Sequence, residues 1–467
     1  MARCNLLRIA LFRTLLITIA SRFVLLYSGS TEPIFNKGGL VPNPDDKPFP
    51  SFKDFKDSVM SAYAEPLAAS GPEQPDNKLR EMRTHLARMY RDIEAEHSFV
   101  DENGQIFDCV PISQQPGLKG ASPASLPDDA PVPIGARKVK KTESAAQSSR
   151  IQADKFGNTT QCPEGTVPIR RLTVEELMRF DSLQQFFRKT PRGKGRHPRL
   201  SAPEAGLGVA SGVHKYAHAF QDINNTGGHS FINIWQPSVG PQVFSLSQHW
   251  YAGGNPLQTV ECGWQVYPQK YGHDKPVLFT YWTADDYGTT GCYNHDCDAF
   301  VQTNSAWKLG GSLETISTPG GQQFELEVTW RLVSGNWWLY LNGTTANDVV
   351  GYYPGSLFRG GQMTTGATNI DYGGEAVNST SWPPMGSGAF ADQGFGKAAY
   401  HRNIYFLAGG SAQQASLRPG QSSPACYTVT IAAAPDPWDE FFYYGGPGGT
   451  DCPDTAPVAP PPLKPVT

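Results

Sequence analysis

The sequence predicts an all-β fold, an antiparallel β-sandwich, preceded by a smaller domain of mixed α and β structure. From about residue 213 onward, short runs of alternating apolar and polar residues are separated by turn sequences, as in antiparallel sheets. The chain also contains 48 glycines and 39 prolines but only 18% charged residues, a composition typical of turn-rich β proteins. The helical patterns lie before residue 190 and predict the smaller domain.

Alternation is clearest in the run FELEVTWRL at residues 324–332. The sequence SGN then turns the chain into NWWLYLN, which predicts a β-hairpin. Further predicted strands are HSFINIWQP, QVFSLSQHWYA, TVECGWQVYP, VLFTYWTA, AFVQTN, MTTGATNIDYGGEAVN and YHRNIYFL. Strands this numerous and short favour two packed sheets.

The front part of the chain combines helices with a short strand. Starting near residue 74, apolar residues at alternating steps of three and four define one face of a helix. These residues are Leu79, Met82, Leu86, Met89 and Ile93. The run QIFDCVPI predicts a strand, and Thr173 with Glu176 has the spacing of a capping box that opens a second helix.

The N-terminal residues 1–29 have the arginines and the apolar stretch of a secretory signal peptide, although Arg22 interrupts the apolar stretch. An uncleaved signal anchor or an organelle transit peptide is the alternative interpretation. No later apolar run is long enough to cross a bilayer. We expect a soluble protein in the extracellular space or cell wall, with the vacuole as the alternative location.

Composition divides the remainder into two modules. The front module is predicted at 30–205, and it contains a Pro, Ser and Ala-rich insert at 116–150 that is expected to be disordered. A basic linker at 188–205 is expected to be a solvated connector and a site for proteolysis. The back module is predicted at 206–453, before a proline-rich tail at 454–467.

Cysteine spacing suggests disulfides and leaves one thiol over. Pairing is predicted for Cys292 with Cys297 and for Cys426 with Cys452, and less directly for Cys109 with Cys162, which leaves Cys262 unpaired. Because His295 lies between Cys292 and Cys297, a metal site is an alternative, but no second cluster completes a tetrahedral ligand set. Four glycosylation sequons, at Asn158, Asn224, Asn342 and Asn378, agree with secretion.

Several function classes are disfavoured by the sequence. The net charge of -4 gives no general electrostatic basis for binding nucleic acid. The glycine pairs lie in predicted turns, so a phosphate-binding loop is not indicated, and no GxSxG motif supports a serine hydrolase. We therefore expect no cofactor and no metal.

The stretch VECGWQVYP at 260–268 raises the question of which residue is reactive. Strand alternation places Cys262 with Val260 and Trp264 on an apolar face, which predicts a buried, unreactive thiol. Glu261 lies on the opposite face. Glu375, in DYGGEAVN, is the second candidate, because two carboxyls held together can divide the roles of acid and base between them.

A family resemblance singles out these two glutamates. The back module carries, in order, SLSQHWY, VECGWQVYP, YWTADDYGTTGCYNHDC, FVQTN, GNWWLYLNG, VGYYPGSLF, YGGEAVN, MGSGAF, GFGKAAYHRNI and FYYGGPGG. Together with FDCVPISQQP and QCPEGTVPIRR in the front module, the sequence resembles the neprosin family of secreted plant proteins from about residue 75 to 453. The resemblance departs where Cys262 replaces a small residue and where the front module has a longer insert.

The resemblance implies a propeptide followed by a β-sandwich glutamic peptidase, with Glu261 and Glu375 as the catalytic pair. It implies an endopeptidase that cleaves after proline in polypeptides at acid pH, and a propeptide that acts as an intramolecular inhibitor. An acid optimum also follows from the chemistry, because one carboxyl must hold a proton and ordinary carboxyls do so only below about pH 4 to 5. The chain is expected to be a monomer.

Candidates for supporting the substrate or an oxyanion lie on neighbouring predicted strands: Gln265, Trp282, Gln302 and Tyr372. Two rival functions are compatible with the same sequence. A non-catalytic carbohydrate- or cell-wall-binding sandwich would use aromatic residues expected to be exposed, namely Trp337, Trp338 and Tyr340. A glycosidase would also use two carboxylates.

Overall fold

The computed structural model describes residues 49–64, 75–133, 153–189, 214–240, 244–378, 381–435 and 437–453. The predicted signal peptide at 1–29, the proline-rich tail at 454–467, part of the insert and most of the basic linker lie outside the described residues. No helix among the described residues is long and apolar enough to cross a membrane.

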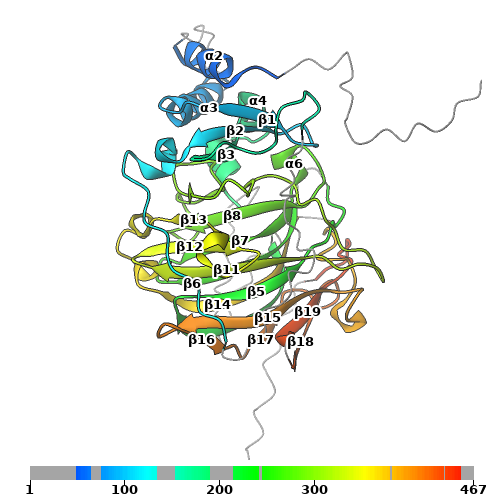
Figure 1. The fold of residues 1–467 in the computed structure, drawn as a ribbon. Helices are drawn as coiled ribbons and strands as arrows, with labels where there is room; N and C mark the ends of the chain where they lie inside the picture. The colour runs from blue at the N-terminus through cyan, green and yellow to red at the C-terminus, as the bar shows by residue number, and fades with distance from the viewer. Residues whose placement is uncertain are drawn as a thin grey trace, which may run out of the picture. The chain divides into compact units, whose positions relative to one another are not determined.

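The element order separates a front part with most of the helices from a back part made of strands (Figure 1). The α-helices are α2 (Phe52–Ala64), α3 (Pro75–Tyr90), α4 (Val174–Leu177), α5 (Leu183–Phe187) and α6 (Pro268–Tyr271). The front strands are β1 (His97–Val100), β2 (Ile106–Pro111) and β3 (Thr166–Arg170). The back strands are β4 (His214–Asn225), β5 (Gly227–Asn233), β6 (Phe244–Gly253), β7 (Gln258–Val266), β8 (Val277–Thr283), β9 (Cys292–Tyr293), β10 (Val301–Gln302), β11 (Glu325–Val333), β12 (Asn336–Leu341), β13 (Val349–Tyr353), β14 (Ala367–Val377), β15 (Ala399–Ala408), β16 (Ser411–Gln414), β17 (Arg418–Gln421), β18 (Thr428–Ala434) and β19 (Asp439–Gly445).

The back strands form an antiparallel β-sandwich, as the sequence predicted. One sheet has seven strands in the order β17-β4-β14-β6-β7-β8-β9. The other has nine strands, with the order β10-β13-β12-β11-β5-β15-β19-β18 and β16 paired with β15. In this arrangement β6 lies between β7 and β14, which brings together two strands that are far apart in the sequence.

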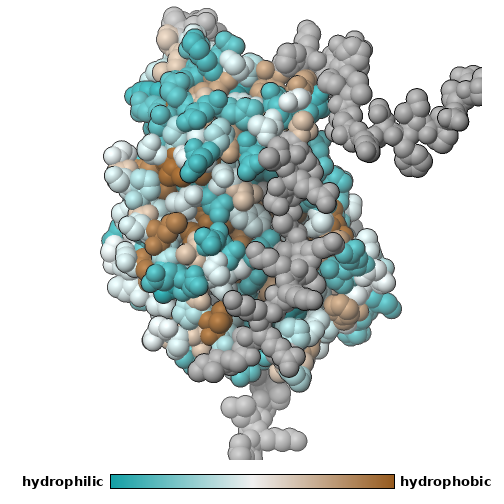
Figure 2. Space-filling model, viewed as in Figure 1, coloured by the Kyte–Doolittle hydropathy of each residue, from teal (hydrophilic) through white to brown (hydrophobic). Residues whose placement is uncertain are grey.

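The inner faces of the two sheets share one apolar core. From β7 this core takes Val260, Cys262, Trp264 and Val266, the face that alternation predicted to be apolar. Each aliphatic side chain buried in this way contributes roughly 1.5–3 kcal/mol of transfer free energy. The face of the molecule seen in Figure 2 is accordingly hydrophilic or neutral over most of its area, with hydrophobic residues in small patches.

The predicted hairpin joins β11 to β12. Val333 pairs with Asn336, so Ser334 and Gly335 form a two-residue turn. Both turn residues have positive φ, at 50° and 79°, which matches the right-handed twist of the paired strands. The turn chemistry therefore fixes the register that buries Trp330 and Leu326.

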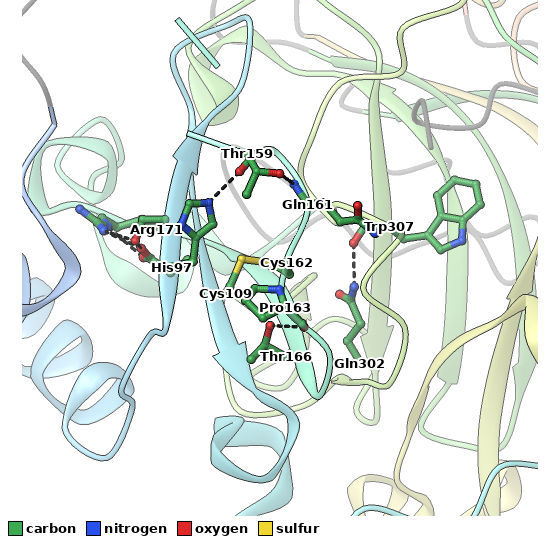
Figure 3. Close-up of a disulfide and its surroundings, with 12 residues drawn as sticks. His97, Cys109, Thr159, Gln161, Cys162, Pro163, Thr166, Arg171, Gln302 and Trp307 are labelled. Carbon is green, nitrogen blue, oxygen red and sulfur yellow. Dashed lines mark hydrogen bonds and ion pairs between the residues drawn. A yellow bond between two sulfur atoms is a disulfide. The ribbon is translucent and has the colours of Figure 1, made fainter. Parts of the chain in front are cut away.

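The front part is a small α+β unit. Helix α3 ends at Tyr90, and Met82, Leu86 and Met89 on its predicted apolar face are buried in a cluster that includes residues of β2 and β3. The capping box predicted at Thr173 is present at the start of α4. A disulfide between Cys109 of β2 and Cys162 ties the loop before β3 to the sheet, as Figure 3 shows.

The described part of the proline-rich insert does not match the predicted disorder. Residues 116–133 run against the nine-stranded sheet, where Leu118 and Ala130 are buried. The backbone carbonyl of Asp128 accepts hydrogen bonds from Arg331 Nη1 at 2.9 Å and Tyr340 Oη at 2.9 Å. Packing against the sandwich orders a segment whose own composition lacks the apolar residues to form a core.

The aromatic residues expected to be exposed for carbohydrate binding are buried instead. Trp337 lies in the core between the sheets with an exposed fraction of 0%, and its indole donates to the Met363 carbonyl at 2.7 Å. Trp338 and Tyr340 form a separate cluster with the segment that carries Leu118. The expectation of an exposed aromatic platform was therefore wrong for this chain.

The described residues form three disulfides, Cys109–Cys162, Cys292–Cys297 and Cys426–Cys452. Their sulfurs are consequently not available as metal ligands, and no group of potential metal ligands is found in the part of the chain that the structure describes. Among the predicted sequons, Asn224 is exposed and Asn158 and Asn378 are partly buried. The Asn342 amide nitrogen is buried, so a glycan on Asn342 does not fit this structure.

Candidate active site

Glu261 and Glu375 lie on the outer face of the seven-stranded sheet. Glu261 is on β7 and Glu375 on β14, and β6 separates these two strands. On β6, Trp250 is opposite Glu261 and Leu246 is opposite Glu375. Both carboxylates are fully buried. Because buried carboxylates are costly unless they are paired, their surroundings determine what they can do.

The partner of both carboxylates is a lysine from the front part of the chain. Lys189 Nζ contacts Glu261 Oε2 at 2.6 Å and Glu375 Oε2 at 3.0 Å. The exposed fraction of Lys189 is 2%, and Trp250 and Tyr281 lie within cation–π distance of its ammonium. One ammonium thus holds two glutamates that come from strands more than a hundred residues apart.

Lys189 belongs to the stretch predicted to be a solvated basic linker, so that prediction was wrong at this position. The positive charges alone do not distinguish Lys189 from its basic neighbours, because residues 188–199 contain no acidic residue that could mark one of them as paired. The acidic partners lie on the sandwich, and only tertiary packing brings them to Lys189. The remainder of the linker, residues 190–205, lies outside the described residues.

Glu261 also accepts hydrogen bonds from three side chains of the sandwich. Thr259 Oγ1 donates to Oε1 at 2.8 Å, Tyr287 Oη donates to Oε1 at 2.6 Å, and Gln248 Nε2 donates to Oε2 at 2.9 Å. Burial, followed by the charge of Glu261, raises the pKa of Tyr287 well above its ordinary value. The phenol therefore keeps its proton and remains a donor to the carboxylate.

A tight loop after β8 brings Tyr287 to Glu261. The Asp285 carboxylate accepts backbone hydrogen bonds from Gly288, Thr289 and Thr290 within that loop. These bonds and the bonds from the threonine hydroxyls outweigh burial and lower the pKa of Asp285 to about 2. The anion consequently persists in acid and keeps the loop folded there.

Glu375 also has two polar neighbours on β4. His214 Nδ1 lies 2.5 Å from Glu375 Oε1, and Tyr216 Oη donates to the same oxygen at 3.3 Å. Burial, then the charge of Glu375, raises the pKa of Tyr216 well above its ordinary value. Sequence reasoning missed Gln248, Tyr287, His214 and Tyr216. Alternation along the predicted strand QVFSLSQHWYA could have placed Gln248 on an outward face, but not in contact with a carboxylate.

The residues predicted to support the glutamates lie elsewhere. Gln265 is on the same face of β7 as Glu261, where it donates to Tyr293 Oη at 3.2 Å. Trp282 and Tyr372 are in the core between the sheets, on the face opposite to the glutamates. Gln302 is on β10 of the other sheet and donates to the Trp307 carbonyl at 2.7 Å, as Figure 3 shows.

Cys262, the neighbour of Glu261, is a free and fully buried cysteine in that inner core. Burial raises the pKa of the Cys262 thiol far above its ordinary value. A thiol that stays protonated in an apolar core is a poor nucleophile. This result agrees with the alternation argument and leaves the glutamates as the reactive candidates.

The front part is held against the sandwich by buried polar contacts around Asp296. His85 of α3 is 2.9 Å from the Asp296 carbonyl through Nε2. Arg170 of β3 lies 3.8 Å from the Asp296 carboxylate. Lys270, on α6 of the sandwich part, contacts the Asp296 carboxylate through Nζ at 2.7 Å. The same Nζ donates to the carbonyl of Phe186, on α5 of the front part, at 3.2 Å.

His85 makes this contact sensitive to acid. Because a carbonyl only accepts, Nε2 carries the proton, and Nδ1 is buried without a partner among the described residues. Burial, assisted by Arg88 and opposed by Asp296 and Asp298, lowers the pKa of His85 from 6.5 to about 4. The docked state therefore loses stability as the pH falls from 6.5 toward 4, by on the order of 3 kcal/mol once His85 is protonated.

We predict that His85→Gln shifts acid release of the front part to lower pH. The glutamine amide can donate to the Asp296 carbonyl but takes up no proton, so this contribution to the pH dependence disappears. The measurement is the pH at which the front part separates from the sandwich in purified protein after the linker has been nicked. His97→Gln is the control, since His97 bonds Thr159 within the front part. An unchanged midpoint for His85→Gln would contradict the prediction.

Comparison with known proteins identifies both parts of the chain. Residues 98–220 match the family described as Neprosin activation peptide, and residues 241–447 match the family described as Neprosin. The end of the activation-peptide match overlaps the first residues of β4, which pairs with β14 in the seven-stranded sheet. We call the described residues up to Lys189 the activation peptide.

Two solved structures illustrate the comparison of folds. A crystal structure of scytalido-glutamic peptidase with a transition state analog inhibitor has a TM-score of 0.28 and 8% identity, covering 50% of this chain and 98% of that chain. A structure of SCP-B, a member of the Eqolisin family of peptidases, in a complex with the tripeptide Ala-Ile-His has a TM-score of 0.25 and 8% identity, with the same coverage of 50% and 98%.

The two family matches occur in the order that the sequence motifs predicted, with the activation peptide first. They span the small α+β unit and the sandwich that carry the lysine and the two glutamates. The chain belongs to the neprosin family.

Proposed function

We propose that this chain is the zymogen of a secreted glutamic endopeptidase that cleaves after proline at acid pH, with Glu261 and Glu375 as its catalytic pair. The observation that carries the proposal is that both buried carboxylates contact one lysine, Lys189, which the activation peptide supplies. A buried pair of carboxylates neutralised by a removable cation is suited to latency followed by acid–base chemistry. Three disulfides support an oxidising compartment.

The chemistry needs one glutamate ionised and the other protonated. The ionised carboxylate takes a proton from water while the water oxygen forms a bond to the scissile carbonyl carbon, and the carbonyl electron pair moves onto its oxygen. The intermediate then collapses, the carbon–nitrogen bond breaks, and the leaving nitrogen takes a proton from the protonated carboxyl. Two like charges held close together favour this unequal protonation once Lys189 has left.

Latency follows from the same contacts. Lys189 occupies the space between the glutamates, and Arg188 beside it donates to the Gly288 carbonyl at 2.5 Å in the loop that carries Tyr287. Protonation of a glutamate removes its attraction for the ammonium, so acid weakens the contact that covers the site. Protonation of His85 in acid destabilises its buried contact with Asp296, which also weakens the docking of the activation peptide.

The test is cleavage of a defined peptide by the purified full chain after acidification. We expect mass spectrometry to show cleavage of a peptide at its single proline, and much slower cleavage of the same peptide with alanine at that position. Cell-wall polysaccharide is assayed in parallel for binding and for hydrolysis. Retention on polysaccharide without peptide cleavage would favour the binding-protein alternative, and glycan hydrolysis would favour a glycosidase.

A further inference from the structure

Gln248 occupies the position between the two glutamates. On β6 it lies midway between Leu246, which is opposite Glu375, and Trp250, which is opposite Glu261. Leu246 and Trp250 belong to the outer cluster of the seven-stranded sheet, and alternation gives Gln248 the same face. The central strand of the site therefore presents a carboxamide where the flanking strands present carboxylates.

The Gln248 side chain uses only part of its hydrogen-bonding capacity. It is fully buried, and Nε2 donates to Glu261 Oε2 at 2.9 Å, the same oxygen that Lys189 contacts. Its Oε1 is buried without a partner among the described residues. A carboxamide offers two donors and a carbonyl acceptor, and a buried polar group left unpaired costs about 1–3 kcal/mol. The amide nitrogen carries a second N–H besides the one that Glu261 accepts, so Gln248 can also donate to an oxygen of a group that enters the site.

The two strands that flank β6 place glycines beside Gln248. Its register partners are Gly263 on β7 and Gly373 on β14. A Cβ at Gly263 would lie 1.9 Å from the Ser247 carbonyl oxygen, and Gly373 has φ of 144°, so the backbone requires glycine at both positions. The consequence is a strip without side chains on either side of Gln248, where another backbone can approach closely.

We infer that Gln248 is a further catalytic residue of the proposed peptidase. One amide N–H positions the Glu261 carboxylate, and the other N–H donates to the scissile carbonyl oxygen as that oxygen gains negative charge. The inference rests on the proposed function and adds to it the group that stabilises the oxyanion. Removal of one such donor typically lowers kcat about 10²- to 10³-fold.

The test compares two variants of the full chain after acidification. Gln248→Met retains the approximate length of the side chain but has no N–H, and we expect kcat for the proline peptide to fall about 10²- to 10³-fold with KM little changed. Gln248→Glu retains the shape and donates only when protonated. Its activity should therefore recover as the pH falls below about 4 to 5, a change of pH profile that a packing role would not produce.

The matched control is Gln258→Met. Gln258 is also a buried glutamine of this sheet, but its amide bonds the backbone of Phe358 and Met363 and does not contact either glutamate. We expect this control to lower the Tm and to leave kcat unchanged. Normal kcat in Gln248→Met, or a wild-type pH profile in Gln248→Glu, would overturn the assignment of Gln248 alone. Absence of peptide cleavage by the wild-type chain would overturn the proposed function itself, and this inference with it.

Discussion

Replacement of Glu261 or Glu375 with glutamine is expected to lower kcat for a proline peptide by at least about 10³-fold. Glutamine has nearly the shape of glutamate and can keep a hydrogen bond to Tyr287 or Tyr216, but it neither accepts a proton from water nor gives one to a leaving nitrogen. Because both proton transfers are needed, each single variant should lose nearly all activity. The measurement is initial rate against substrate concentration across acid pH, with mass spectrometry to locate the cleaved bond.

A matched control separates catalysis from folding. Glu327 is also a strand glutamate with a polar partner, since it lies 3.2 Å from His229 Nε2, but it belongs to the other sheet. Glu327→Gln should retain kcat. If both Glu261→Gln and Glu375→Gln cleave the peptide at the wild-type rate, the catalytic pair is wrong, and if only one does, the remaining glutamate must act without the other.

Replacement of Lys189 with methionine is expected to produce a chain that is active without acidification. The change removes the ammonium but keeps much of the aliphatic stem, and it leaves two buried carboxylates without the ammonium that contacts both of them. Breaking a buried ion pair in this way costs about 3–5 kcal/mol. If this cost falls on the docked state, the fraction of molecules with an open site rises by about 10²-fold to about 4,000-fold, at roughly tenfold for each 1.4 kcal/mol. The measurement is the initial rate of peptide cleavage at a mildly acid pH at which the wild type is still latent, with and without prior treatment at lower pH.

Lys53→Met serves as the control for Lys189→Met. Lys53 is also a lysine of the activation peptide paired with a carboxylate, but its ion pair with Asp57 is exposed on α2. An exposed ion pair contributes little to stability, so this variant should stay as latent as the wild type. Latency equal to wild type in Lys189→Met would show that other contacts of the activation peptide hold the site closed.

Alternation along single strands was the most informative property of the sequence. It predicted that Cys262 and Trp264 face the core and that Glu261 lies on the opposite face of the strand. The structure confirms both positions. The same argument, applied strand by strand, did not say which outward residues meet. Gln265 shares the face of Glu261 but bonds Tyr293, whereas Gln248, from a strand whose register was unknown, reaches Glu261. Strand order and register are long-range properties, and no local pattern specifies them.

Gln302 and the basic stretch illustrate two other limits of prediction from sequence patterns. The motif that contains Gln302 predicts a place near the glutamates, yet Gln302 belongs to the other sheet, because membership of a sheet depends on pairing that sequence periodicity does not report. The basic stretch is predicted to be solvated because charged residues usually are exposed. Lys189 is the exception, since two carboxylates from elsewhere in the chain compensate the cost of its burial.

The sequence by itself determined the sandwich, the order of the two modules, the helical face of α3, the capping box at Thr173 and the inward position of Cys262. These features follow from local turn chemistry and from the period of the apolar residues, which are properties of short segments. Tertiary structure alone decided that Glu261, Glu375, Gln248 and Lys189 meet on one sheet face. Their meeting depends on the insertion of β6 between β7 and β14 and on the docking of the activation peptide, which are pairings between segments distant in the chain.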